Sequence, residues 1–149
     1  MQADRGGVDI RHTGDSGNIN VANADVRADI VKVAVLGNNG VLNIGGGTLS
    51  ADTTLKLYST GSNGSVNFIA DVTLGGASQK IIAGNAVTIF NNVTVTIQGQ
   101  NPASVFTNSA NYSRQYGGNG STTGTFGGIG ANNPQPLANA PPLGPPGGP

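Results

Sequence analysis

A short pattern recurs along the first part of the chain at nearly constant steps, and it limits the folds that the chain can adopt. The pattern is a glycine followed by alternating polar and apolar residues, and its copies read GNINV at 17–21, GVLNI at 40–44 and GSVNF at 64–68. A weaker fourth copy, GNAVTI, starts at Gly84, so the glycine steps are 23, 24 and 20 residues. Self-similarity at a step of about 20 to 50 residues is typical of repeat architectures.

Each repeat holds short strands rather than helices. Apolar residues recur at every second position, as in VTVTI at 93–97 and LKL at 55–57, and this is the period of a strand. The strands are bounded by Asn-Gly and Gly-Gly, with no helical stretch between them. An antiparallel sandwich and a solenoid both satisfy these observations, but only a solenoid requires the pattern to recur at a fixed step. We therefore predict an all-β fold, a parallel β-helix (β-solenoid) of about four coils that lie about 4.8 Å apart.

The repeat also predicts which side chains stack in successive coils. Because neighbouring side chains of a strand point to opposite faces, two apolar positions should form inward ladders and the residue between them an outward row. The expected core ladders are Ile19, Leu42, Val66 and Val87, and Val21, Ile44, Phe68 and Ile89. The expected outward row is Asn20, Asn43 and Asn67, followed by Thr88. Stacked amides can hydrogen-bond along the solenoid axis, so this row has a structural use that requires no ligand.

The composition changes near residue 98. Every acidic residue lies at or before Asp71, and all eight prolines lie between Pro102 and Pro149. The segment beyond residue 98 is dominated by Gly, Asn, Ser, Thr and Pro, which leaves too little apolar surface to offset the entropy of ordering it. We therefore predict a solenoid domain at 1–97 and an extended, irregular tail at 98–149 that is disordered or docked on the solenoid or on a neighbouring subunit.

The charge and the composition argue against several classes of protein. Seven Lys and Arg balance seven acidic residues, so the chain has no excess of positive charge for nucleic acid. There is no cysteine to form a disulfide or a thiolate metal ligand, and no apolar run is long enough to span a membrane. We expect no nucleic-acid partner, no membrane span, no metal and no cofactor.

Few residues offer chemistry. Asp29 and Asp52 occupy equivalent positions of the repeat and are expected to stack. The pair would form either a weak ligand or cation contact or a solvated face balanced by a stack of Lys32 and Lys56. The single His12 lies in a predicted turn, where sequence neighbours rarely provide an oriented catalytic triad. We expect no catalytic residues and therefore no enzyme.

Several stretches resemble filamentous-haemagglutinin-type bacterial exoproteins. They are GGTLSAD at 46–52, LKLY at 55–58, GSNGSVNF at 61–68, KIIAGNAVTI at 80–89 and PASVFTN at 102–108, in this order along the chain. The resemblance extends from about residue 8 to about residue 140. It implies a right-handed parallel β-helix, secretion or display on the bacterial cell surface, and a role in adhesion or surface architecture, with no catalytic residues.

Two functions follow as hypotheses. The first is a non-catalytic extracellular structural or adhesion protein whose open coil ends continue a longer β-helix or stack on other copies into fibres. The second is a carbohydrate-binding or polysaccharide-lyase-like β-helix protein that contacts a host or surface glycan through the outward Asn and Asp rows. Both hypotheses place the protein outside the cell or on its surface.

Overall fold

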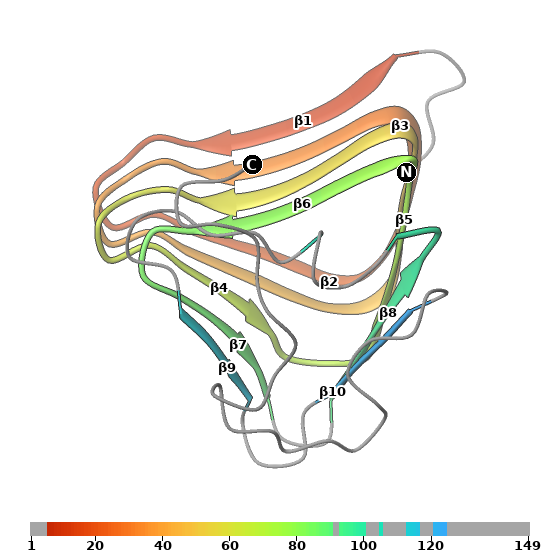
Figure 1. The fold of residues 1–149 in the computed structure, drawn as a ribbon. Coiled ribbons are helices and arrows are strands. Elements are labelled where there is room, and N and C mark those ends of the chain that lie inside the picture. The colour runs from red at the N-terminus through yellow and green to blue at the C-terminus, as the bar shows by residue number, and fades with distance from the viewer. Residues whose placement is uncertain (1–5, 91–92, 101–104, 106–112, 117–120, 125–149) are drawn as a thin grey trace.

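The computed structural model describes residues 6–90, 93–100, 105, 113–116 and 121–124. All strand pairs in this part of the chain are parallel, and the strands wind into a solenoid of about four coils (Figure 1). The predicted all-β parallel β-helix is therefore confirmed. Its strands are β1 (Gly7–His12), β2 (Asn18–Val35), β3 (Val41–Ser59), β4 (Ser65–Phe68), β5 (Val72–Gly75), β6 (Ser78–Ala83), β7 (Ala86–Ile89), β8 (Thr94–Gln98), β9 (Ser113–Tyr116) and β10 (Ser121–Gly124).

Three parallel sheets form the faces of the solenoid, because β2 and β3 are long enough to run along all three (Figure 1). The β6 face stacks β1, residues 30–35 of β2, residues 54–59 of β3, and β6. The β4 face stacks residues 18–22 of β2, residues 41–45 of β3, β4, β7 and β9. The β5 face stacks residues 24–28 of β2, residues 47–51 of β3, β5, β8 and β10. Equivalent residues of successive coils lie in register and form columns along the axis.

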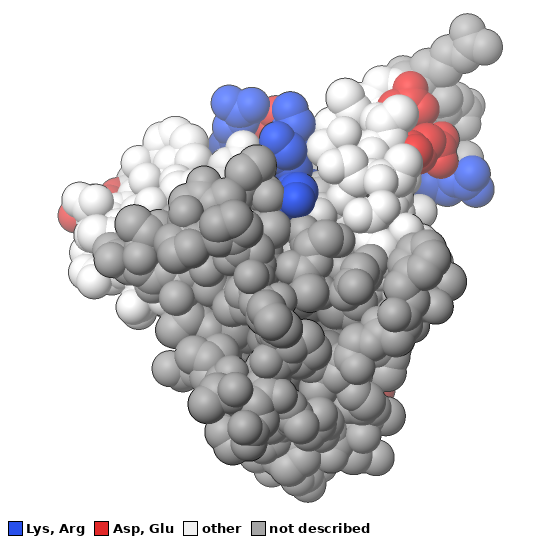
Figure 2. Space-filling model, viewed as in Figure 1, with Lys and Arg blue, Asp and Glu red and all other residues white. Residues whose placement is uncertain are grey.

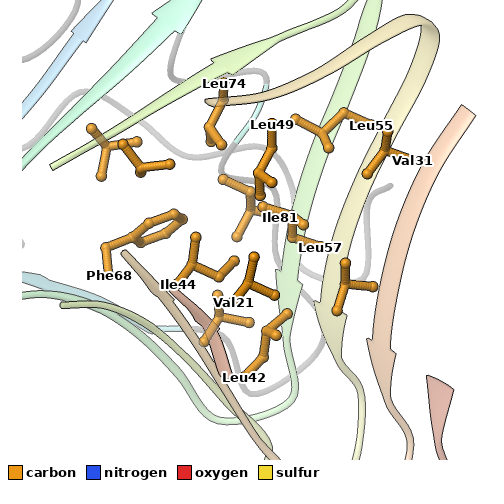
Figure 3. Close-up of a cluster of buried hydrophobic side chains, with 14 of the residues drawn as sticks. Val21, Val31, Leu42, Ile44, Leu49, Leu55, Leu57, Phe68, Leu74 and Ile81 are labelled. Atoms are coloured by element: carbon orange, nitrogen blue, oxygen red, sulfur yellow. The ribbon is translucent and has the colours of Figure 1, made fainter. Parts of the chain in front are cut away.

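The core lies between the three faces and is built from inward columns of apolar side chains (Figure 3). The predicted ladders are in register, since Ile19 pairs with Leu42 and Val21 pairs with Ile44 in the next coil, and their later members follow. Every member is buried except Ile19, which is half-buried and lies in the first coil of its column. The β6 and β5 faces add columns of their own, among them Val33, Leu57 and Ile81, and Leu49, Leu74 and Ile97.

The corner between the β6 and β4 faces is the same turn in three coils. Residues 14–17, 37–40 and 61–64 share the pattern Gly-x-x-Gly, and the amide of the second glycine donates to the carbonyl oxygen of the first at 3.2, 3.1 and 2.8 Å. The first glycines stack closely, because a Cβ atom on Gly37 would lie 1.9 Å from the carbonyl oxygen of Gly14. The same approach to a backbone carbonyl oxygen occurs at Gly61, so the column requires glycine in the coils that follow Gly14.

The fourth copy of the repeat is aligned differently from the prediction. The sequence pattern equated Gly84 with the second glycine of each turn, and this alignment is wrong. Ser65 pairs with Ala86, so the step between the third and fourth coils is one residue longer than predicted. Gly84 instead continues the column of first glycines, where a Cβ atom would lie 1.9 Å from the carbonyl oxygen of Gly61.

The corner between the β4 and β5 faces turns at residues with positive φ. These are Asn23 at 50°, Gly46 at 81° and Gly47 at 79°. A side chain at residue 47 is also sterically excluded, because a Cβ atom there would lie 2.3 Å from the carbonyl oxygen of Ala24. The triple glycine at 45–47 lies at this corner of the second coil.

Two strands lie in the segment predicted as a tail. β9 pairs in parallel with β7, and β10 pairs in parallel with β8. The parallel pairing of the β4 and β5 faces therefore continues beyond residue 97. The rest of the segment 98–149 lies outside the described residues, apart from residues 98–100 and the buried Val105.

Candidate functional site

The outward asparagine row forms a continuous amide ladder on the β4 face. Asn43 Nδ2 donates to Asn20 Oδ1 at 2.8 Å, and Asn67 Nδ2 donates to Asn43 Oδ1 at 2.9 Å. Thr88 follows in register in the fourth coil. Because each amide bonds to the amide of the neighbouring coil, the row ties coils together along the axis, and this geometry gives it a structural use.

The two candidate carboxylates, Asp29 and Asp52, are not paired in the register. The step between β2 and β3 changes from 23 residues at Ala28 to 24 at Ile30, so a β-bulge lies where the two aspartates were expected to stack. Asp29 Oδ2 accepts a hydrogen bond from the Gly6 amide at 3.2 Å, on the side of the preceding coil.

Asp52 has a different partner from Asp29. Its Oδ1 lies 3.7 Å from Nη2 of Arg27, and both side chains are largely exposed. An exposed ion pair of this kind contributes little to stability. The extra residue of the second coil thus separates the roles of two aspartates that look equivalent in the sequence.

Other aspartates act as clamps between coils. Asp15 Oδ1 accepts from the Asn38 amide at 3.2 Å, Asp25 Oδ1 from the Thr48 amide at 3.0 Å, and Asp71 Oδ1 from the Thr94 amide at 2.7 Å. Each bond spans 23 residues, which is one coil. No group of three or more His, Cys, Asp or Glu that could hold a metal ion occurs among the described residues. Asp15, Asp25 and Asp71 thus have a structural use in hydrogen bonds between coils.

A column of lysines runs along the outward side of the β6 face. Lys32, Lys56 and Lys80 lie in register in three successive coils, and Asp9 precedes them in β1. Figure 2 shows a cluster of Lys and Arg atoms over this part of the molecule. The sequence predicted a stack of Lys32 with Lys56 but did not include Lys80. The alternation in QKI at 79–81, which matches LKL at 55–57, was the signal that could have found it.

Asp9 and Arg11 form a bidentate pair at the first coil of this face. Arg11 Nε donates to Asp9 Oδ1 at 2.8 Å, and Nη2 donates to Asp9 Oδ2 at 2.6 Å. The hydrogen bonds from Arg11 hold the pKa of Asp9 below its ordinary value of 3.8, against a smaller effect of desolvation, and the charges of Arg11 and Lys32 add to the lowering. The hydrogen bond with Asp9 in turn raises the pKa of Arg11.

His12 ends β1 and is exposed. Its Nδ1 accepts a hydrogen bond from the Gly14 amide at 3.1 Å, so the ring folds over its own turn. The ring also occupies the space above Gly17, where a Cβ atom would lie 2.0 Å from Nδ1. This placement gives His12 a role in the first turn of the solenoid.

Because the comparisons with known proteins give no match, any functional argument for this chain rests on its fold and on the surfaces described above. No protein-family model matches the chain, and neither a curated protein nor a solved structure matches it. Within the described residues, no helix has the length and apolar character needed to cross a membrane.

Proposed function

We propose that this chain is a non-catalytic structural and adhesion protein, secreted or displayed on the bacterial cell surface, whose solenoid associates end-on with another solenoid. The surface location and the adhesive role rest on the resemblance to filamentous-haemagglutinin-type exoproteins. End-on association rests on the first coil, which exposes positions that are core positions in every later coil.

The clearest such position is Ile10 in β1. Its side chain is 39% exposed, whereas Val33, Leu57 and Ile81 in the same column are 2%, 0% and 1% exposed. Covering an isoleucine of this kind is worth about 1–2 kcal/mol, because apolar burial stabilises by about 25 cal/mol per Å². A coil stacked on β1 would bury Ile10 in the way that Val33, Leu57 and Ile81 are buried in the same column.

The other two faces are open at the same end. Ile19 on the β4 face and Val26 on the β5 face are only half-buried, although their columns are fully buried in later coils. β1 and residues 18–28 of β2 pair on one side only within the described part of the chain. We call these two segments the N-terminal edge. An unpaired strand edge above an unfinished core is a template for another chain.

Light scattering and negative-stain electron microscopy of the full chain, over a range of protein concentrations, test this proposal. We expect association that increases with concentration and that Ile10→Lys abolishes. Ile69→Lys is the matched control, because Ile69 is 42% exposed but lies in the third coil, away from the N-terminal edge. A chain that stays monomeric at every concentration contradicts the proposal, and so does equal loss of association in both variants.

Carbohydrate binding is a second candidate function, supported by the lysine column rather than by the Asn and Asp rows. Three ammonium groups repeat at the coil spacing of about 4.8 Å, which suits a linear polysaccharide with one acidic group on each sugar. Binding to an array of acidic glycans should weaken with salt and be lost in Lys56→Glu, while Arg27→Glu on the β5 face leaves it unchanged. Absence of binding to every acidic glycan removes this candidate.

A further inference from the structure

We infer that the N-terminal edge binds a second copy of this chain, through antiparallel pairing of β1 with β1 of that copy about a two-fold axis at Ile10. The inference rests on the proposed end-on association and specifies its partner and its geometry. It follows from the side-chain alternation, the charges and the exposed apolar residues of the edge.

The alternation of β1 fixes the sides of its residues. Asp9 and Arg11 lie on the outward side, in the columns of Lys32 and Ala34, while Ile10 lies in the inward column of Val33. A two-fold axis must therefore pass through a residue of β1. An axis between two residues would set an inward side chain of one copy against an outward side chain of the other.

The charges of β1 select one axis. An axis through Asp9 would set two carboxylates against each other, and an axis through Arg11 would set two guanidinium groups against each other. Like charges directly opposite in a sheet are destabilising. An axis through Ile10 instead sets Asp9 of each copy opposite Arg11 of the other, and an axis nearer either end of β1 pairs fewer of its six residues. The bidentate pair within each strand then becomes a network of four charges.

The same axis covers the open core. It places the two Ile10 side chains opposite each other, each in the position that Val33 and Leu57 fill in the later coils. Because the axis passes through the β6 face, it lays the β4 face of one copy on the β5 face of the other. The half-buried Ile19 of one copy then lies on the side of the half-buried Val26 of the other.

The opposite end of the described solenoid is a poorer electrostatic partner. The last described strands of the three faces are β6, β9 and β10, and they carry two positive charges, Lys80 and Arg114, and no carboxylate. A head-to-tail neighbour would therefore place Lys80 in the column of Asp9 but offer no carboxylate to Arg11. The N-terminal edge carries charges of both signs, Asp9 and Arg11 in β1 and Asp25 and Arg27 in β2. A second N-terminal edge therefore matches it better than a head-to-tail neighbour does.

Single-cysteine cross-linking of the full chain tests the two-fold geometry directly, because the protein has no native cysteine. Directly opposite residues of an antiparallel pair have Cα atoms about 4.5–5.5 Å apart, within the reach of a disulfide. Ile10→Cys should oxidise to a covalent dimer, while Ile69→Cys should stay monomeric. In head-to-tail stacking, the N-terminal edge of one copy lies against the opposite end of the next copy. The two residues at position 10 are then far apart, and no such dimer forms.

A charge-reversal cycle provides the second measurement. By analytical ultracentrifugation, Asp9→Arg and Arg11→Asp should each weaken dimerisation about tenfold or more, because each sets like charges against each other across the axis. The double variant, Asp9→Arg with Arg11→Asp, should recover most of the wild-type affinity. If the wild type associates but the Ile10→Cys variant forms no cross-link and the double variant shows no recovery, the two-fold geometry is overturned and end-on association stands. A monomeric wild type overturns both.

Discussion

Gly61 lies directly over Gly37 in the next coil of the solenoid, and a Cβ atom on Gly61 would stand 2.0 Å from the carbonyl oxygen of Gly37. The same approach recurs one coil earlier and one coil later, at Gly37 and Gly84. The corner between the β6 and β4 faces thus brings backbones so close together that no side chain fits between them. The close approach is a property of the coil spacing and not of one turn.

Gly61→Ala should therefore destabilise the protein by about 2 kcal/mol or more, because the new methyl group can be accommodated only by moving the backbone of two coils. Urea unfolding at one fixed protein concentration measures the change. Gly75→Ala is the matched control. Its Cβ atom would meet the Ser50 hydroxyl at 3.2 Å, and this flexible group can move aside. Similar losses in the two variants would show that the glycine column is not required by close packing.

The centre of the asparagine ladder should matter more than its end. Asn43→Ala removes the bond donated to Asn20, a longer one donated to Asn18 at 3.4 Å and the bond accepted from Asn67, whereas Asn20→Ala removes only the first. With a net value of about 1 kcal/mol for each hydrogen bond, we expect a loss of about 2 kcal/mol for Asn43→Ala and about half of that for Asn20→Ala. Thermal and urea unfolding of both variants measure the ratio, and equal losses would argue against a ladder that acts along the axis.

The sequence predicted the periodic part of this structure because each coil repeats the same physical problem. Alternation identified the columns of Leu42 and Ile44, and stacking at the coil spacing explained the Asn row. The prediction failed where a coil changes length. One extra residue in the second coil offsets Asp29 from Asp52, and the misjudged step at Gly84 placed that glycine in the wrong column. The coil length of 23 or 24 residues can be predicted from the sequence. The position of the extra residue within the coil cannot, because it depends on tertiary contacts.

The Asp9–Arg11 pair should be visible in a titration. Its hydrogen bonds lower the pKa of Asp9 in the folded protein, so any stabilisation from the pair is present above the unfolded pKa and is lost as the pH falls through the folded one. We expect the Asp9 carboxyl resonance to titrate below pH 3.8, and Arg11→Gln to move its midpoint upward. Added salt should also raise the midpoint, because both groups are exposed. A midpoint that is unchanged by Arg11→Gln would contradict this pairing.

Gln79 carries a buried amide at a core position, and the repeat did not predict a polar residue there. It is 1% exposed and pairs with Leu55 of the previous coil. Its Nε2 donates to the carbonyl oxygens of Gly76 at 3.1 Å and of Gln98 at 2.5 Å, while its Oε1 has no hydrogen-bond partner among the described residues. The side chain therefore ties the corner after β5 to the end of β8 through its donor alone.

Gln79→Glu tests this donor role, because a carboxylate has nearly the same shape but cannot donate when ionised. Burial raises the pKa of the introduced carboxyl above the value of about 4.3 for an unfolded chain, so the folded state of the variant loses stability as the pH rises from that value. We expect a loss of more than about 2 kcal/mol at pH 7 and a smaller loss near pH 4, measured by urea unfolding. The exposed Gln98→Glu is the control and should change stability little at either pH. If Gln79→Glu is as stable as the wild type at pH 7, the amide of Gln79 does not hold this corner through its donated hydrogen bonds.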